Sequence, residues 1–445
     1  MKIVIAGAGD VGFHLAELLV HENQDIVLID TNQDVLDYAN SHLDVLTVYG
    51  DSASIDVLHQ ADVGRARLVL AVTTEEPTNL ITAILAKKLG AHQAIARVSN
   101  PEYLVEGQRQ TFEELGIDHL ISPRELAAQE IQRLLRQCSF TDVFEFENGK
   151  ISLVGITVDD YSPFVNLKLR EVQGNNGLHF RPMAILRGHR TLLPNEDTIL
   201  RRNDHVYFIT PKEHIDELEG RIGKEKVKVR NVMILGGTGL GYATAKLLEK
   251  EFNVTLIEHV KDRCKVLSEK LNNTLVIHGD YSNIGLLEEE GLNNMDAFIA
   301  LTPNSETNII TSLTAKNHGV YKTIAQVENK EYVHISQNIG VDTLINKKLI
   351  AANNIFRFVR KGQVEAITSL HGVDAEVIEF VVAKKNQLTR KPLEQLHIPK
   401  GAVVGTVLRG EESLIPGDDF QLQLDDKVIV LAVPEAIGKV ERLFR

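Results

Sequence analysis

Three glycines near the start of the chain have the spacing of a phosphate-binding loop. They form the motif Gly7-x-Gly9-x-x-Gly12, which follows an apolar segment at 3–6 and precedes a segment with helical periodicity. Gly7 permits a tight turn, Gly9 lacks the Cβ that would keep a pyrophosphate from the backbone, and Gly12 lets helix and strand pack closely. The N–H groups and dipole at the helix start favour an anion. The spacing predicts a nucleotide-binding turn, with a glycine-rich turn that binds nothing as the alternative.

Asp30 ends the second apolar segment, 18 residues after Gly12. A carboxylate at this place accepts hydrogen bonds from the ribose 2′-hydroxyl, and it repels the 2′-phosphate that distinguishes NADP. The motif and the carboxylate together therefore predict a site for NAD, as NAD+ or NADH, rather than for NADP.

Polar residues follow further apolar segments, at the edge where open α/β sheets bind ligands. Asp51 is placed either to contact the adenosine end of a nucleotide or to cap a helix that starts at Ser52. Thr73-Thr74 follow the fourth segment, and Arg97 lies in the fifth. A buried arginine needs an anionic partner, so Arg97 is either a phosphate contact or a member of a structural ion pair.

The same arrangement returns 229 residues later. Gly236–Gly241 repeats the loop, Gly279-Asp280 repeats Gly50-Asp51, and Glu258 takes the place of the first carboxylate. A repeat of this length sets the architecture of the whole chain, since each copy must fold alike.

Two substitutions distinguish the second copy. Thr238 replaces the middle glycine, so a Cβ stands where the pyrophosphate would approach the backbone. Gln326 replaces Arg97 and removes a positive charge. We expect the second site to bind more weakly than the first, or to prefer a different nucleotide.

A parallel sheet would bring these residues together. Residues 1–123 alternate segments rich in Val, Ile and Leu with helical stretches, which is typical of parallel strands covered by helices. This alternation predicts a doubly wound sheet. The expected strands are 3–6, 26–29, 45–49, 68–72, 94–98 and 119–121.

Residues 143–219 have a different character, with short apolar runs that end in turn residues. They predict a small α+β module, which residues 363–441 repeat, and the polar, basic segment 220–230 predicts a linker. The expected fold class is α/β, with two Rossmann-like doubly wound parallel-sheet domains alternating with two small α+β domains. The expected segments are 1–123, 124–138, 139–225, 229–347, 348–362 and 363–445.

The two short segments in this series, 124–138 and 348–362, are expected to be connecting helices. The first carries an apolar stripe at Leu126, Ile131 and Leu134, and Pro123 suits its first turn. Such a helix either packs on its own domain or is exchanged with another domain or subunit.

Composition limits the partners. The formal net charge is −13, so the surface repels nucleic-acid backbone and anionic lipid heads. Direct membrane insertion is not expected, because no run approaches the roughly 20 apolar residues of a membrane span. The two cysteines form no Cys-x-x-Cys pair, which fits a reducing cytosol. The scattered histidines have no metal-ligand spacing and offer no evident general acid for hydride transfer.

The order of the domains, with the segments 3–12, 95–98, 194–209 and 416–430, resembles the TrkA family of potassium uptake regulators, within the class of regulators of potassium conductance (RCK). The resemblance covers essentially the whole chain. It implies a cytosolic, non-enzymatic gating subunit, peripheral on the cytoplasmic face of the inner membrane. It implies a homotetramer presenting eight nucleotide-type domains to a membrane potassium-translocating subunit of the Trk system. It also implies binding of NAD or NADH, and of ATP or ADP in some members.

The resemblance places nucleotide contacts on both copies. In the first copy they are Gly7, Ala8, Gly9, Asp10, Val11, Gly12, Asp30, Asp51, Thr73, Thr74 and Arg97. In the second copy they are Gly236, Gly237, Thr238, Gly239, Leu240, Gly241, Glu258 and Asp280.

Two other functions are compatible with the same motifs. A duplicated NAD-dependent oxidoreductase would show substrate-dependent turnover of NADH. A soluble NAD sensor with a transcription or enzyme partner would not sediment with membranes.

Overall fold

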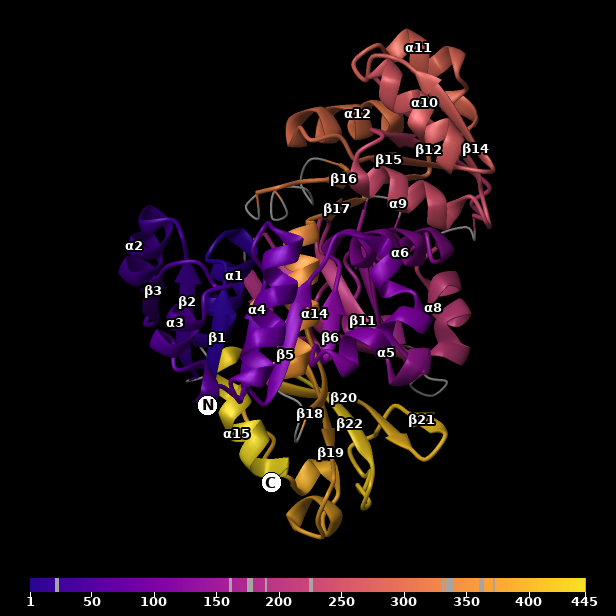
Figure 1. Ribbon diagram of the computed structural model, residues 1–445. Coiled ribbons are helices and arrows are strands. Elements are labelled where there is room, and N and C mark those ends of the chain that lie inside the picture. The colour runs from indigo at the N-terminus through magenta and orange to yellow at the C-terminus, as the bar shows by residue number, and fades with distance from the viewer. Residues whose placement is uncertain are drawn as a thin grey trace. The chain divides into compact units, whose positions relative to one another are not determined.

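The computed structural model describes residues 1–20, 24–159, 162–173, 179–188, 190–223, 227–329, 332, 340–359, 364–370 and 373–444. These residues form two parallel six-stranded sheets and two antiparallel five-stranded sheets, which alternate along the chain (Figure 1). The predicted α/β class is confirmed. Among the described residues, no helix is both long enough and apolar enough to cross a bilayer.

The first parallel sheet has the strand order β3-β2-β1-β4-β5-β6. Its central strand is buried on both faces, because Ile3, Val4 and Ile5 have no exposed surface. All six predicted strands are confirmed: β1 (Lys2–Ala6), β2 (Asp25–Asp30), β3 (Leu46–Tyr49), β4 (Leu68–Ala71), β5 (Gln93–Arg97) and β6 (His119–Ile121). The helices are α1 (Asp10–Val20), α2 (Gln33–His42), α3 (Ile55–Gln60), α4 (Glu76–Lys88), α5 (Glu106–Glu114) and α6 (Pro123–Arg136).

The second parallel sheet repeats this order as β14-β13-β12-β15-β16-β17. Its strands are β12 (Asn231–Leu235), β13 (Asn253–Glu258), β14 (Thr274–His278), β15 (Ala297–Ala300), β16 (Lys322–Gln326) and β17 (Thr343–Ile345). Its helices are α9 (Gly239–Leu248), α10 (Lys261–Lys270), α11 (Ile284–Glu289) and α12 (Ser305–Asn317), and α14 (Lys347–Val359) follows.

The two antiparallel sheets belong to the small modules. The first has β7 (Asp142–Phe146), β8 (Ile151–Thr157), β9 (Arg181–Arg187), β10 (Arg190–Leu192) and β11 (His205–Pro211), with α7 (Leu169–Gln173) and α8 (Ile215–Arg221). The second has β18 (Val364–Ser369), β19 (Glu376–Val381), β20 (Ala402–Arg409), β21 (Glu412–Leu414) and β22 (Lys427–Ala432), with α15 (Pro434–Phe444).

The two small modules share one hydrophobic core. Met183 and Tyr207 of the first module pack in the same buried cluster as Leu408 and Ile429 of the second. Arg181 crosses from one module to the other and donates from Nη1 to the carbonyl oxygen of Val404 at 2.8 Å. Burial lowers the pKa of this guanidinium. The modules are therefore partners within one chain and bury each other's apolar faces.

The sequence Leu-Arg-Gly occurs in both small modules, at residues 186–188 and 408–410, and its arginine has a structural role. Arg187 pairs with Asp204 at 2.7 Å, and Arg409 pairs with Asp426 at 2.8 Å. Both aspartate side chains are almost fully buried. A buried carboxylate needs a charged partner, which explains why the arginine is retained in both copies.

The chain divides into two compact units. Unit 1 holds residues 1–129 and 346–359, and unit 2 holds residues 130–345 and 360–445. Unit 1 therefore includes α14, which packs on α1 of the first nucleotide-type domain (Figure 1). In unit 2, Arg136 of α6 pairs with Glu251 at 2.6 Å. The helix α14 thus follows the second nucleotide-type domain in the chain but packs on the first, which is the exchanged arrangement considered from the sequence.

The helix α8 corrects one predicted boundary. It continues to Arg221, inside the segment 220–230 that the sequence indicated as a linker. The reason is that Leu218 and Ile222, four residues apart, are both buried and hold the helix against the module. Linker residues 224–226 and residues 360–362 of the predicted second connecting helix lie outside the described residues. The division into six segments stays a prediction.

Candidate functional site

The first glycine loop has two glycines that are needed by the fold and one that is not. Gly7 has a φ of +99°, and a Cβ on it would lie 2.8 Å from the backbone nitrogen of Thr73. A Cβ on Gly12 would lie 1.8 Å from the carbonyl oxygen of Gly7. A Cβ on Gly9 would meet nothing within 4 Å. Gly9 therefore has open space in front of it, as a ligand-facing position requires.

A cavity of about 540 Å³ lies at this loop, within unit 1. Its lining includes nine of the eleven predicted residues of the first copy, from the ends of β1, β2, β3, β4 and β5 and the start of α1. Those nine are Gly7, Gly9, Asp10, Val11, Asp30, Asp51, Thr73, Thr74 and Arg97. Ala8 and Gly12 are buried and do not line the cavity.

Asp30 is held by backbone donors from two loops. The N–H of Ala8 donates to Oδ2 at 2.7 Å, and the N–H of Asn32 donates to Oδ1 at 2.9 Å. The residue stays partly exposed at the cavity wall. A carboxylate oxygen has two acceptor positions, so this side chain is oriented and can still accept hydrogen bonds from a ribose.

Arg97 is a half-buried cation that faces the same cavity. Among the described residues its guanidinium makes no hydrogen bond and no ion pair, and its charged neighbour is Arg124. Burial, and then the charge of Arg124, lower the pKa of Arg97. The alternative from the sequence was that Arg97 belongs to a structural ion pair. None of the described residues provides the carboxylate for such a pair. An unpaired buried charge is costly, and a bound anion would offset that cost.

The structure corrects the second role considered for Asp51. Helix α3 begins at Ile55 rather than at Ser52, so Asp51 does not cap it. Its Oδ1 instead accepts from the N–H of Ala53 at 2.9 Å, an Asx turn that fixes the loop after β3. Thr73 is bonded to Asn79, which holds the backbone of the β4–α4 loop at the cavity.

Two lysines of the cavity were not found from the sequence. Lys347 and Lys348, at the start of α14, line the first cleft. Lys348 is ion-paired with Asp10, at the start of α1. The two partners are 338 positions apart, and no local pattern connects them. Only the exchanged packing of α14 brings these cations to the cleft.

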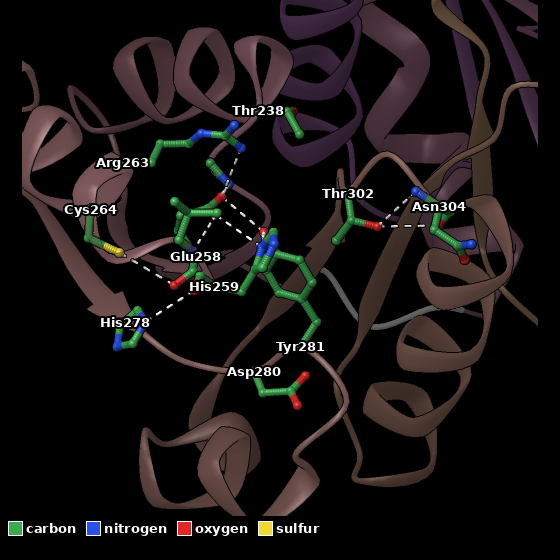
Figure 2. A network of polar contacts seen from close by, with 12 residues as sticks. Thr238, Glu258, His259, Arg263, Cys264, His278, Asp280, Tyr281, Thr302 and Asn304 are labelled. Carbon is green, nitrogen blue, oxygen red and sulfur yellow. Dashed lines mark hydrogen bonds and ion pairs between the residues drawn. The ribbon is translucent and has the colours of Figure 1, made fainter.

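In the second copy, the carboxylate beside the glycine loop accepts its hydrogen bonds from the protein itself. Glu258 has no exposed surface. It accepts from the N–H groups of Gly237 at 2.7 Å and Val260 at 2.8 Å, which repeat the contacts of Asp30. In addition the Tyr281 hydroxyl donates to Oε2 at 2.9 Å and Arg263 lies 3.6 Å away (Figure 2).

These contacts shift the pKa values of Glu258 and Tyr281 in opposite directions. Burial raises the pKa of Glu258, but the donors of Val260, Tyr281 and Gly237 and the charge of Arg263 outweigh it and bring that pKa below its ordinary value. Burial and the bond to Glu258 raise the pKa of Tyr281. In the first copy, the place of Tyr281 is taken by Ser52, whose hydroxyl contacts Thr82 instead.

The side chains of Thr238 and Gln326 are also hydrogen-bonded within the protein. The Thr238 hydroxyl caps α9, accepting from the N–H of Gly241 at 3.1 Å and donating to the carbonyl of Leu301 at 2.9 Å. It thus occupies an N–H that would otherwise face an anion. Gln326 is buried and donates to Glu328 at 2.7 Å. Asp280 is exposed and binds Ser282, its neighbour in the loop.

A further cavity, of about 580 Å³, lies in unit 2 between the first small module and the second parallel sheet. Two pairs of charged or titratable groups line it: Lys316 pairs with Asp342 at 2.8 Å, and His205 with Asp142 at 2.9 Å. Lys322 donates to the carbonyl of Phe140 at 2.6 Å. The first cleft differs in holding Arg97, so it is the better candidate for an anionic ligand.

Comparisons with known proteins agree with this architecture. The TrkA-N domain family matches residues 3–123 and 232–347, and the TrkA-C domain family matches residues 153–223 and 377–445. The Trk system potassium uptake protein TrkA homolog of Archaeoglobus fulgidus is 35% identical over 449 residues, covering 100% of both chains. The Trk system potassium uptake protein TrkA of Vibrio alginolyticus is 34% identical over 453 residues, covering 100% of this chain and 99% of that protein.

Solved structures share the fold over the full length. The GsuK RCK domain has a TM-score of 0.61 at 17% identity, covering 100% of this chain and 94% of that chain. The GsuK channel bound to NAD has a TM-score of 0.61 at 18% identity, covering 100% of this chain and 78% of that chain. Together with the duplicated domain matches and the full-length relatives, this places the chain in the TrkA family of Trk system potassium uptake proteins.

Proposed function

We propose that this chain is the cytosolic regulatory subunit of a Trk-type potassium uptake system and that nucleotide in its first cleft gates the membrane potassium-translocating subunit. The observation that carries the nucleotide part is Arg97, a cation without an ion pair among the described residues, beside an open glycine loop. The names of the full-length relatives support a potassium-uptake regulator over a duplicated NAD-dependent oxidoreductase.

The ligand in the first cleft is NAD+ or NADH, with ATP or ADP as competitors. Asp30 accepts from the ribose, the start of α1 and Gly9 face the pyrophosphate, and Arg97 pairs with a phosphate. A solved neighbour described as a channel bound to NAD supports the first ligand, and another described as bound to ADP supports the second. Parallel titrations with NADH, NAD+, ATP and ADP rank them.

Nucleotide binding would act by shifting a conformational equilibrium. A ligand does so only by its different affinity for two states, and a coupling of about 1–3 kcal/mol corresponds to roughly 5–150-fold. Helix α14 is suited to transmit the change. It packs on α1, Lys348 pairs with Asp10 at the cleft, and the second small module follows α14 in the chain. In a homotetrameric ring at the cytoplasmic face of the inner membrane, the shifts caused by nucleotides bound at several sites would add together.

Potassium or rubidium uptake in cells that lack this chain tests the proposal. We expect uptake to be lost, restored by the wild-type chain and not restored by Asp30→Ala. Rescue by both chains would keep the transport role and remove the first cleft from gating. Unchanged uptake in a deletion strain with no redundant transporter would contradict the transport role and return attention to NADH turnover.

The unequal clefts predict one tightly bound nucleotide per chain. In the second copy, the Tyr281 hydroxyl bonds to the carboxylate that a ribose would need, and the Thr238 hydroxyl bonds to an N–H that a phosphate would need. We expect Thr238→Gly with Tyr281→Ser, which restores the residue types of the first copy, to raise the calorimetric stoichiometry toward two. Thr307→Gly with Tyr332→Ser serves as the control pair. Two equal sites in the wild-type chain would contradict this prediction.

A further inference from the structure

Two histidines and a glutamate meet on the first small module. His179 lies two residues before β9, His214 ends the 3-10 turn Lys212–His214, and Glu217 lies in α8. One imidazole nitrogen from each histidine and one carboxylate oxygen of Glu217 all lie within 4.8 Å of one another. We propose that these three side chains bind a divalent transition metal ion, with Zn²⁺ the best match, independently of the nucleotide.

The distances suit a small ion. Nδ1 of His179 lies 2.7 Å from Oε2 of Glu217, and Nδ1 of His214 lies 3.8 Å from the same oxygen. Ligands about 2.0–2.2 Å from a tetrahedral Zn²⁺ are about 3.3 Å apart, so modest side-chain rotations bring these three into place. The two imidazole rings are stacked with their centroids 4.0 Å apart, so at least one ring must turn for both in-plane nitrogen lone pairs to meet at one ion.

Arg221 prepares the carboxylate for this role. Its Nη2 donates to Oε1 of Glu217 at 3.2 Å, while Oε2 is turned toward the imidazoles. The set thus offers two imidazole nitrogens and one carboxylate oxygen, with Arg221 as the outer partner of the carboxylate, and this is donor chemistry that Zn²⁺ takes.

The site is accessible and belongs to one module only. The side chains of His179, His214 and Glu217 are 42%, 32% and 34% exposed, so an ion can reach them from solvent. The corresponding positions of the second module, 222 residues later, hold Gly401, Ala436 and Lys439. The packing of α8 against its module does not require this set, since α15 packs in the second module without it. A ligand role accounts for the difference.

Calorimetric titration of the full chain with Zn²⁺ tests the proposal, using protein that carries no polyhistidine tag and has been dialysed against a chelator. We expect one strong site per chain, at least about tenfold weaker in His214→Ala and in Glu217→Gln. His318→Ala is the matched control, because His318 also faces a glutamate, Glu288, at 3.4 Å but stands outside the set. The visible absorption of bound Co²⁺ reports tetrahedral imidazole and carboxylate ligation.

The outcomes are separable from those of the nucleotide site. Asp30→Ala should keep full Zn²⁺ binding, and His214→Ala should keep nucleotide binding. Melting curves of the metal-free variants show whether they are folded. No zinc binding by the wild-type chain, or equal binding by folded His214→Ala and Glu217→Gln, would overturn the proposed site.

Discussion

Gly9→Val abolishes nucleotide binding to the first cleft while the chain keeps its fold. The position of the added Cβ has no atom within 4 Å, so the branched side chain is accommodated by the protein and projects into the space of the pyrophosphate. We expect affinity to fall by about 100-fold or more, which is about 2.8 kcal/mol at 1.4 kcal/mol per tenfold. Isothermal titration with NADH measures the affinity, and thermal melting measures the fold.

Valine substitutions at two other glycines serve as comparisons for Gly9→Val. Gly107→Val is the matched control, because Gly107 also has open space at its Cβ position but lies in α5, outside the cleft lining. It should bind nucleotide normally. Gly12→Val should damage the fold itself, since its Cβ would overlap the carbonyl of Gly7. Normal binding by Gly9→Val would show that the ligand does not approach this loop.

Glu258→Ala destabilises unit 2 and leaves nucleotide binding to the first cleft unchanged. The substitution leaves the donors of Gly237, Val260 and Tyr281 without their acceptor and Arg263 without its ion-pair partner. Leaving a buried donor without its acceptor costs about 1–3 kcal/mol, so the loss of these bonds together is expected to cost about 3–5 kcal/mol. For a domain of this size that is a melting-temperature decrease of roughly 6–20 °C. Scanning calorimetry measures it.

The equivalent change in the first copy should behave oppositely. Asp30→Ala removes a partly exposed carboxylate, so we expect a smaller loss of stability and a large loss of nucleotide affinity. Asp262→Ala is the control for lost acidic charge on the second domain, because that side chain is 91% exposed. Equal destabilisation by Asp262→Ala and Glu258→Ala would contradict a network role for Glu258.

The same variant predicts a dependence on pH. The folded-state pKa of Glu258 lies below its ordinary value, so the unfolded chain takes up the proton first as the pH falls. The stabilisation is therefore complete above the ordinary glutamate value of about 4.3 and is lost as the pH drops through the lowered folded value. We expect the melting difference between wild type and Glu258→Ala to be largest near neutral pH and to shrink below about pH 4.

Local patterns in the sequence were sufficient for the sheets and the first cleft. Alternating apolar segments predict the parallel strands, because their burial on both faces is written into consecutive residues. Gly7, Gly9, Asp30 and Arg97 meet because the carboxyl ends of parallel strands share one sheet edge. The repeat likewise indicated that the second copy departs from the first at Thr238 and Gln326.

Only the tertiary structure decided which donors contact each carboxylate. It also decided which cations line the first cleft. Tyr281 stands where the first copy has Ser52, and its hydroxyl reaches Glu258 because β14, which precedes its loop, pairs with β13, which ends at Glu258. Lys347 and Lys348 read as the start of an ordinary helix, and the exchange of α14 carries them to the first cleft. Contacts between residues hundreds of positions apart depend on how elements pack, and packing leaves no periodic trace in the sequence.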